Sequence, residues 1–358
     1  MREIGAWRLA FVYAGCFLGA GYVSGQEMWQ FFGVFGIGGV WGLMLAAVLQ
    51  AFFCIVLLSL VRMGNIFEID RAAVRRDRRV LRAMISSAQL LLLVGVSVIM
   101  SAGVGALTEQ VLGQGGTVAS ALFCALVFLA ALRGIRGLVS VFSLTVPLLV
   151  AASLTLAAFA VLHFGGRPYT PAPQDAGSPL LSHWSIGAVL FVSYNLFGSI
   201  AVLIPTARIL RDRRAARRGA VLAAAMLFPV AVAILISLRL APETVRQELP
   251  MLALAQMIHP AVGKAFAFLL LVAMFGTALS CVVAAQGDLV RRFPPLSRHP
   301  ALPVLVLVVI SFVGGLFGFG DLIGWIYPIF GYLGFAVLCA IVAHERHLRR
   351  AQKEGEKL

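Results

Sequence analysis

The residues best suited to chemistry lie between positions 19 and 27, in the middle of the first long apolar run. Three glycines, a serine, a glutamine and a glutamate replace aliphatic side chains there. Glycine weakens a helix by about 1 kcal/mol per residue relative to alanine. Within a bilayer, broken backbone persists only where protein or a water-filled cavity satisfies its N–H and C=O groups. We therefore interpret this run as a broken membrane helix, and the break as a candidate binding site.

The break itself offers groups for an anion. A helix interrupted there exposes free N–H groups and the positive dipole end of its outer half, which suit a carboxylate. Glycines at 19, 21 and 25 let a ligand approach the backbone closely. We predict that residues 20–25 cradle an anionic group. The alternative is that the glycines form a packing face for neighbouring helices.

Glu27 is the only acidic residue well inside an apolar run. An intramembrane carboxylate is a functional hypothesis by default. Three roles are open: a protonated structural group bonded to a second interrupted run, a partner for a substrate ammonium, or the carrier of a coupling proton. The alternative without a functional role is a carboxylate that reaches an outer vestibule. No Lys or Arg lies deep in an apolar run to neutralise it.

A second interruption, at 193–199, places hydroxyl and amide groups inside the apolar run 184–209. We expect the helix to break there as well. Asn195 is a lone amide at membrane depth and needs a partner. Tyr194 or Phe197 either closes over a substrate or packs. The candidate substrate-binding residues are Gly19, Ala20, Gly21, Tyr22, Ser24, Gly25, Glu27, Ser193, Tyr194, Asn195 and Phe197.

The composition defines the elements that must position these residues. Of 358 residues, 61% are hydrophobic and 12% charged, which indicates a polytopic membrane protein. Ten apolar runs are long enough to cross a bilayer. They are 6–34, 37–61, 83–108, 117–133, 138–163, 184–209, 219–240, 262–287, 301–319 and 322–343, of which 117–133 is the shortest.

The net charge of +14 does not indicate nucleic acid. All but four of the 29 Lys and Arg residues fall in segments that become cytoplasmic if the N-terminus is inside. We expect a multi-pass protein of the bacterial inner membrane with both termini in the cytoplasm, whose basic loops contact anionic headgroups. The five cysteines lie within apolar runs without metal-binding spacing, so we interpret them as small core residues. We expect no cofactor apart from a coupling sodium ion or proton.

Ten runs divide into two sets of five, and because five is odd the second set enters the membrane in the opposite direction. Long loops at 62–82 and 241–260 occupy matching places in the two sets, on opposite sides. Breaks at corresponding positions of two halves point to a transporter binding site. We divide the chain into a first repeat (1–163), an external linker (164–183), a second repeat (184–344) and a cytoplasmic tail (345–358). A short helix around 251–258 should cover the outer vestibule.

The run from Gly19 to Glu27, followed by Phe31 and Phe32, resembles the signature of the YkvI-like bacterial membrane proteins. These look like a branch of the amino acid–polyamine–organocation (APC) transporter superfamily. The resemblance implies an all-α, LeuT-like fold: ten transmembrane helices in a 5+5 inverted repeat, with helices 1 and 6 discontinuous. It names no substrate.

The same resemblance implies an ion site, because hydroxyls of helix 8 and carbonyls of broken helix 1 hold sodium in the sodium-coupled relatives. Thr277 and Ser280 lie three residues apart, so both can face one way, and the implied ligands are Ala20, Thr277 and Ser280. The alternative is that these hydroxyls bond to their own helix. Some proton-coupled relatives carry a lysine on helix 5, which run 138–163 lacks. The coupling ion is therefore sodium or a proton carried by Glu27.

These features predict a secondary active transporter that moves a small amino acid or related zwitterion by ion-coupled alternating access. The alternative is a membrane-embedded sensor of the same fold that binds a small molecule without moving it. A channel is a weaker alternative. An enzyme is not expected, because paired intramembrane carboxylates, a metal cluster and a Ser/His arrangement are missing from the sequence pattern. The oligomeric state is left open.

Overall fold

The computed structural model describes residues 4–64, 66, 69–74, 78–133, 138–166 and 177–355, and these residues are almost entirely helical. The α-helices are α1 (Ala6–Phe17), α2 (Ala20–Val23), α3 (Gln26–Phe31), α4 (Ile37–Gly64), α5 (Ile69–Ala73), α6 (Arg79–Leu112), α7 (Gly116–Arg133), α8 (Leu138–Phe164), α9 (Trp184–Arg208), α10 (Arg213–Leu240), α11 (Pro250–Ile258), α12 (Pro260–Arg292), α13 (Ala301–Gly314) and α14 (Phe319–Gly355). Three 3-10 turns join them: η1 (Gly33–Phe35), η2 (Pro242–Thr244) and η3 (Pro294–Arg298).

Each predicted apolar run forms helix. In the described residues, eight helices are long and apolar enough to cross a membrane, and α1 and α13 are shorter apolar helices. The run at 117–133 forms the full 18-residue helix α7. Several helices extend beyond the predicted runs, and one is clearly shorter. The run at 301–319 stops being helical at Gly314, where the backbone turns toward α14.

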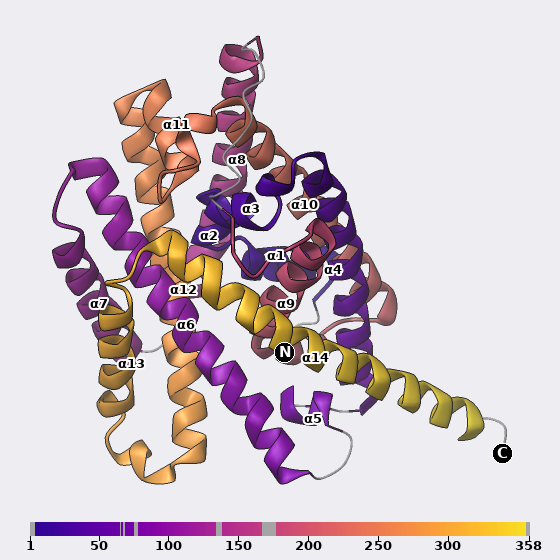
Figure 1. The fold of residues 1–358 in the computed structure, drawn as a ribbon. Helices are drawn as coiled ribbons and strands as arrows, with labels where there is room; N and C mark the ends of the chain where they lie inside the picture. The colour runs from indigo at the N-terminus through magenta and orange to yellow at the C-terminus, as the bar shows by residue number, and fades with distance from the viewer. Residues whose placement is uncertain are drawn as a thin grey trace.

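Helix α14 continues to Gly355, through much of the segment expected to be a tail. Arg349 forms an ion pair with Glu345 one turn earlier, an arrangement that favours helix. The helix crosses the bundle obliquely, and its C-terminal part projects beyond the other helices (Figure 1).

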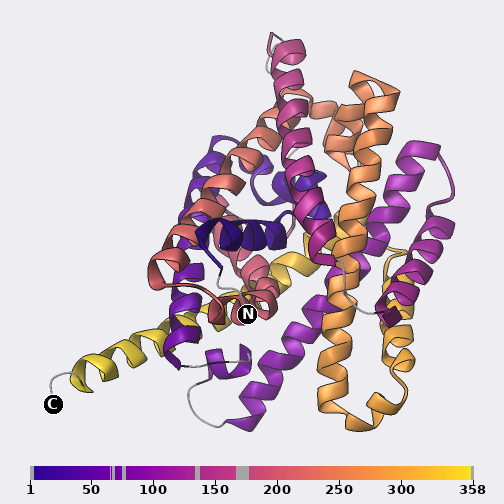
Figure 2. The ribbon, with the colours of Figure 1, turned by 180° about the vertical axis from the view of Figure 1, so that it is seen from behind.

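The two matching loops contain short helices at opposite ends of the bundle. Helix α5 follows α4 and lies at the end that also carries η3, whereas α11 follows α10 and lies at the other end, near the turn between α6 and α7 (Figures 1 and 2). We call these the α5 end and the α11 end. This placement fits two halves with opposite orientation. The helix expected around 251–258 is confirmed as α11.

An aromatic cluster in the core fixes the broken first span against α9. The ring of Phe191, on α9, contacts Phe17, Tyr22, Phe31 and Phe32 with centroid separations between 5.1 and 6.3 Å. All are buried. Aromatic pairs in this range are stabilising by about 0.5–1.5 kcal/mol beyond burial. Both sides of the break therefore have fixed positions relative to one helix.

Candidate functional site

The first span is broken, as the sequence predicts, and it is broken twice. Helix α1 ends at Phe17, and Gly19 has an extended conformation before the four-residue helix α2. A second turn follows at Ser24 and Gly25, where Gly25 has φ of +86°. L-residues with a side chain rarely adopt this region, so glycine suits that position. Because α2 is only one turn long, its dipole is smaller than the sequence argument assumed.

The chain itself satisfies much of the broken backbone. The Ser24 hydroxyl donates to the Gly21 carbonyl at 3.1 Å and accepts the N–H of Gln26 at 3.4 Å. The N–H of Met251, in α11, donates to the Ser24 carbonyl at 2.8 Å. Tyr22 donates its hydroxyl proton to the Leu227 carbonyl, also at 2.8 Å. Ser24 and Tyr22 thus hold the break in place, and α11 covers it from the α11 end.

Glu27 lies at the centre of the site and is only 4% exposed. Its Oε1 accepts a hydrogen bond of 3.3 Å from Asn195 Nδ2, which joins the broken span to α9. Its Oε2 lies 2.8 Å from the place that a Cβ on Gly21 would occupy. The structure therefore brings Gly21, Glu27 and Asn195 together, with Tyr22 next to Gly21 in α2.

The predicted break in the sixth span is wrong for this structure, because α9 is continuous from Trp184 to Arg208. The polar side chains of this stretch bond to their own helix. Ser193 donates to the Val189 carbonyl at 2.6 Å, and Ser199 donates to the Asn195 carbonyl at 2.7 Å. Such back-bonding accommodates hydroxyls in a membrane helix without breaking it. Asn195 also donates to the Phe191 carbonyl, at 3.1 Å.

An aromatic pair beside this site includes one residue that the sequence argument missed. Tyr194 stacks on Tyr327 of α14, with ring centroids 4.3 Å apart and planes inclined by 12°. Each side chain is 4% exposed, and within the described residues the Tyr194 hydroxyl has no hydrogen-bond partner. Tyr327 precedes Pro328 in an otherwise apolar run, which was the available signal. Phe197 is fully buried and packs against Gly334 of α14.

The residues implied for the ion lie on neighbouring elements. Helix α12, which carries Thr277 and Ser280, packs against α2, which begins at Ala20. The Ser280 hydroxyl donates to the Thr277 carbonyl at 2.8 Å. This bond is the back-bonding alternative, and it uses the hydroxyl proton while leaving the oxygen lone pairs available to a cation.

This arrangement of helices belongs to a known class: the protein is an all-α, polytopic membrane protein with the LeuT-like fold. Three solved structures share the fold. The nucleobase-cation-symport-1 family transporter Mhp1, in a closed conformation with bromovinylhydantoin bound, has a TM-score of 0.59 at 14% identity. The match covers 87% of this chain and 71% of the Mhp1 chain. A Na⁺-coupled sialic acid symporter scores 0.60 at 13% identity, covering 87% and 74%. MhsT in complex with L-phenylalanine scores 0.58 at 17% identity, covering 97% and 93%.

Two curated proteins of Bacillus subtilis (strain 168) are similar over almost their whole length. The uncharacterized membrane protein YkvI is 26% identical over 352 residues, which span 97% of this chain and 98% of YkvI. The uncharacterized protein YyaD is 22% identical over 352 residues, spanning 94% and 96%. No protein-family model matches the chain.

Proposed function

We propose that the protein is a secondary active transporter that carries a small amino acid or a related zwitterion by ion-coupled alternating access. The observation that carries this proposal is the Glu27–Asn195 hydrogen bond, which places a buried carboxylate at the break of the first span. The fold shared with Na⁺-coupled symporters supports the transporter class.

In this proposal the two charged groups of the substrate bind to different parts of the break. The substrate ammonium pairs with Glu27, whose Oε2 faces Gly21. The substrate carboxylate meets the backbone N–H groups that open α2, near Ala20. Tyr194 and Tyr327 bound the same space with a stacked aromatic wall. Rocking of one helix bundle against another would then expose the site to each side in turn.

We further propose sodium at Ala20, Thr277 and Ser280, with a proton on Glu27 as the competing means of coupling. The α5 end is assigned to the cytoplasm of a bacterial inner membrane, together with both termini, because the loops at that end carry most of the Lys and Arg residues. These basic loops would contact anionic lipid headgroups. The α11 end then faces outward.

Uptake into proteoliposomes tests the function directly. Radiolabelled amino acids would be offered with an inward sodium gradient, an inward proton gradient, or neither. We expect saturable uptake that one gradient drives and that unlabelled cargo accelerates by exchange. Binding of an amino acid by purified protein, without flux under any gradient, would contradict transport and favour a sensor.

A further inference from the structure

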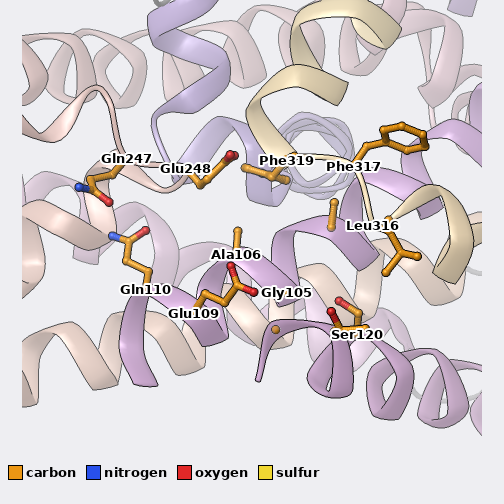
Figure 3. A pocket seen from close by; sticks show the side chains of 15 residues that line it. Gly105, Ala106, Glu109, Gln110, Ser120, Gln247, Glu248, Leu316, Phe317 and Phe319 are labelled. Atoms are coloured by element: carbon orange, nitrogen blue, oxygen red, sulfur yellow. The ribbon is translucent and has the colours of Figure 1, made fainter. Parts of the chain in front are cut away.

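A cavity of about 370 Å³ lies at the α11 end, to one side of the break. Helix α6 contributes Glu109 and Gln110, α7 contributes Ser120, and the segment before α11 contributes Gln247 and Glu248. Phe317, in the turn between α13 and α14, and Phe319, the first residue of α14, also line it. Figure 3 shows Glu109, Gln110, Gln247 and Glu248 arranged around the same space.

The charge of this cavity is negative. Glu109 and Glu248 both line it, and no Lys, Arg or His is among its lining residues. Asp321 adds a third carboxylate: a Cβ on Gly318 would fall 3.2 Å from Glu248 Oε1 and 3.3 Å from Asp321 Oδ2. Across the described part of the chain, none of these three carboxylates forms a salt bridge. Glu248 Oε2 accepts the N–H of Gly320 at 2.6 Å, at the start of α14.

Buried amide oxygens without partners continue from the cavity toward Glu27. The Oε1 atoms of Gln26, Gln30 and Gln110 are buried and accept no hydrogen bond within the described residues. Gln110 lines the cavity, where its Nε2 donates to the Leu249 carbonyl at 3.2 Å. Gln26 is 8% exposed, and its amide lies with the Glu248 carboxylate against Gly320, 2.5 and 3.3 Å from the position of a Cβ there.

Gln30 also contacts this glycine, because its Nε2 donates to the Gly320 carbonyl at 2.8 Å. Gln26 directly precedes Glu27 in the sequence. The cavity and the central carboxylate are thus linked by side chains with unused acceptors. A buried acceptor without a partner is destabilising, so a ligand that donates hydrogen bonds here would be favoured.

We propose that this cavity is a capture site for an organic cation with N–H donors, a primary ammonium group on a small carbon skeleton. An ammonium supplies three hydrogen-bond donors and a positive charge to balance the carboxylates. The cavity is far larger than a single bare ion needs, and Phe317 and Phe319 give the carbon skeleton apolar contact. Capture rests on the proposed transport for its biological role, but binding is measurable without flux.

Three probes of equal size test the ligand class: n-butylammonium, butyrate and 1-butanol. Melting temperatures of the purified full chain would be followed over a concentration series of each, with ionic strength held constant by potassium chloride. We expect stabilisation by butylammonium alone. Equal stabilisation by butyrate or butanol would overturn the assignment. Calcium chloride that displaces butylammonium at lower concentration would overturn it in favour of a metal ion.

Variants locate the site. Glu109→Gln and Glu248→Gln together should weaken butylammonium binding at least tenfold. Glutamine at 248 keeps an oxygen acceptor for the Gly320 N–H, and Glu109→Gln leaves that cap untouched, so the fold is retained. Glu243→Gln is the matched control, because Glu243 lies in the same loop but does not line the cavity. An effect of Glu243→Gln as large as that of the double variant would overturn the location.

Glu27→Gln separates this inference from the transport proposal. The part of butylammonium binding that depends on Glu109 and Glu248 should persist in this variant. Binding that depends on Glu27 but not on Glu109 and Glu248 would overturn the capture site and leave transport standing. Binding that follows Glu109 and Glu248, in a protein that moves no amino acid or amine across liposomes, would overturn transport and leave the capture site standing.

Discussion

Glu27 fills the space that a side chain on Gly21 would need. The Cβ of any other residue at 21 would lie 2.8 Å from Glu27 Oε2 and 3.4 Å from Ile323 Cδ1. Contacts under 3.0 Å force something to move, and here the group that must move is the end of a flexible side chain. Gly21 therefore sets where the carboxylate can lie, although its own backbone is in ordinary helix.

Gly21→Ala should impair transport while leaving the fold intact. The carboxylate can move away at little expense in stability, but it then leaves the position from which it meets Asn195 and the substrate. We expect substrate affinity to fall about tenfold, with a change in melting temperature of only a few degrees. Gly19→Ala is the control, because a Cβ there has nothing within 4 Å. Equal losses in the two variants would show that flexibility of the break, not space beside Glu27, is what matters.

Removing the charge at 27 should strongly reduce flux. Glu27→Gln keeps the shape of the side chain and an oxygen that accepts from Asn195, so the purified protein should melt near the wild-type temperature. Hydrogen bonds to a charged group contribute about 1.5–3 kcal/mol, so uptake should fall about ten- to a hundredfold. The measurement is initial uptake into proteoliposomes at matched protein content. Wild-type flux would remove Glu27 from the mechanism.

The left-handed turn at Gly25 should be a stability element. Gly25→Ala forces a side chain into φ of +86° and brings its Cβ to 3.0 Å from both Leu238 Cδ1 and Met251 Cγ. For a residue with a side chain, the left-handed backbone conformation is destabilising by about 1–2 kcal/mol. Overpacking lowers the stability by a further amount of about 1–3 kcal/mol. Gly113→Ala isolates the backbone term, because φ is +77° there with nothing within 4 Å. Melting temperatures should therefore fall further for Gly25→Ala than for Gly113→Ala.

The Tyr194 hydroxyl has no hydrogen-bond partner among the described residues, so its removal should have opposite effects on stability and on substrate binding. Tyr194→Phe removes a buried polar group without a partner, so the melting temperature should stay equal or rise. If the hydroxyl bonds to the cargo, KM should rise several-fold with kcat little changed. Tyr22→Phe is the contrast, because it removes a donor to the Leu227 carbonyl and should lower the melting temperature. A Tyr194→Phe variant with unchanged KM would confine Tyr194 to packing.

The local sequence was sufficient to predict the break in the first span, but it did not show that the stretch at 193–199 stays helical. The glycines between 19 and 25 weaken helix wherever they lie, and Gly25 needs its positive φ, so composition alone was sufficient. At 193–199 the sequence offers hydroxyls and one amide, and these can either open a helix or bond back to it. The structure shows the second outcome at Ser193, Asn195 and Ser199. Which outcome prevails depends on packing against α4 and α14, which sequence spacing does not reveal.

The cavity at the α11 end was not predictable for a related reason. Its carboxylates are at 109, 248 and 321, each near the end of a helix, where a charged residue ordinarily means exposure to water. Only the tertiary arrangement brings them to one place. Gln26 and Gln30, whose Oε1 atoms accept no hydrogen bond within the described residues, were close to the region that the sequence singled out, yet the bond from Gln30 to Gly320 of α14 spans about 290 residues of chain.

Binding of butylammonium at the cavity should weaken on acidification, beginning at a higher pH than an ordinary glutamate would give. Burial raises the pKa of Glu248 above its usual value of 4.5, the bond from the Gly320 N–H opposes this, and the charges of Asp321 and Glu109 raise it further. A raised pKa means that the proton is taken up earlier as pH falls, and the neutral acid no longer attracts an ammonium.

In the folded state the same shift disfavours the charged form, so ionised Glu248 destabilises the apo protein as pH rises above the unfolded pKa. Glu109→Gln or Asp321→Asn removes one repelling charge and should move the binding midpoint to lower pH, whereas Glu243→Gln should not. Measuring butylammonium affinity from pH 4 to 8 would give the midpoint for each variant. A midpoint that stays the same in both Glu109→Gln and Asp321→Asn would show that Glu248 titrates independently of its neighbours.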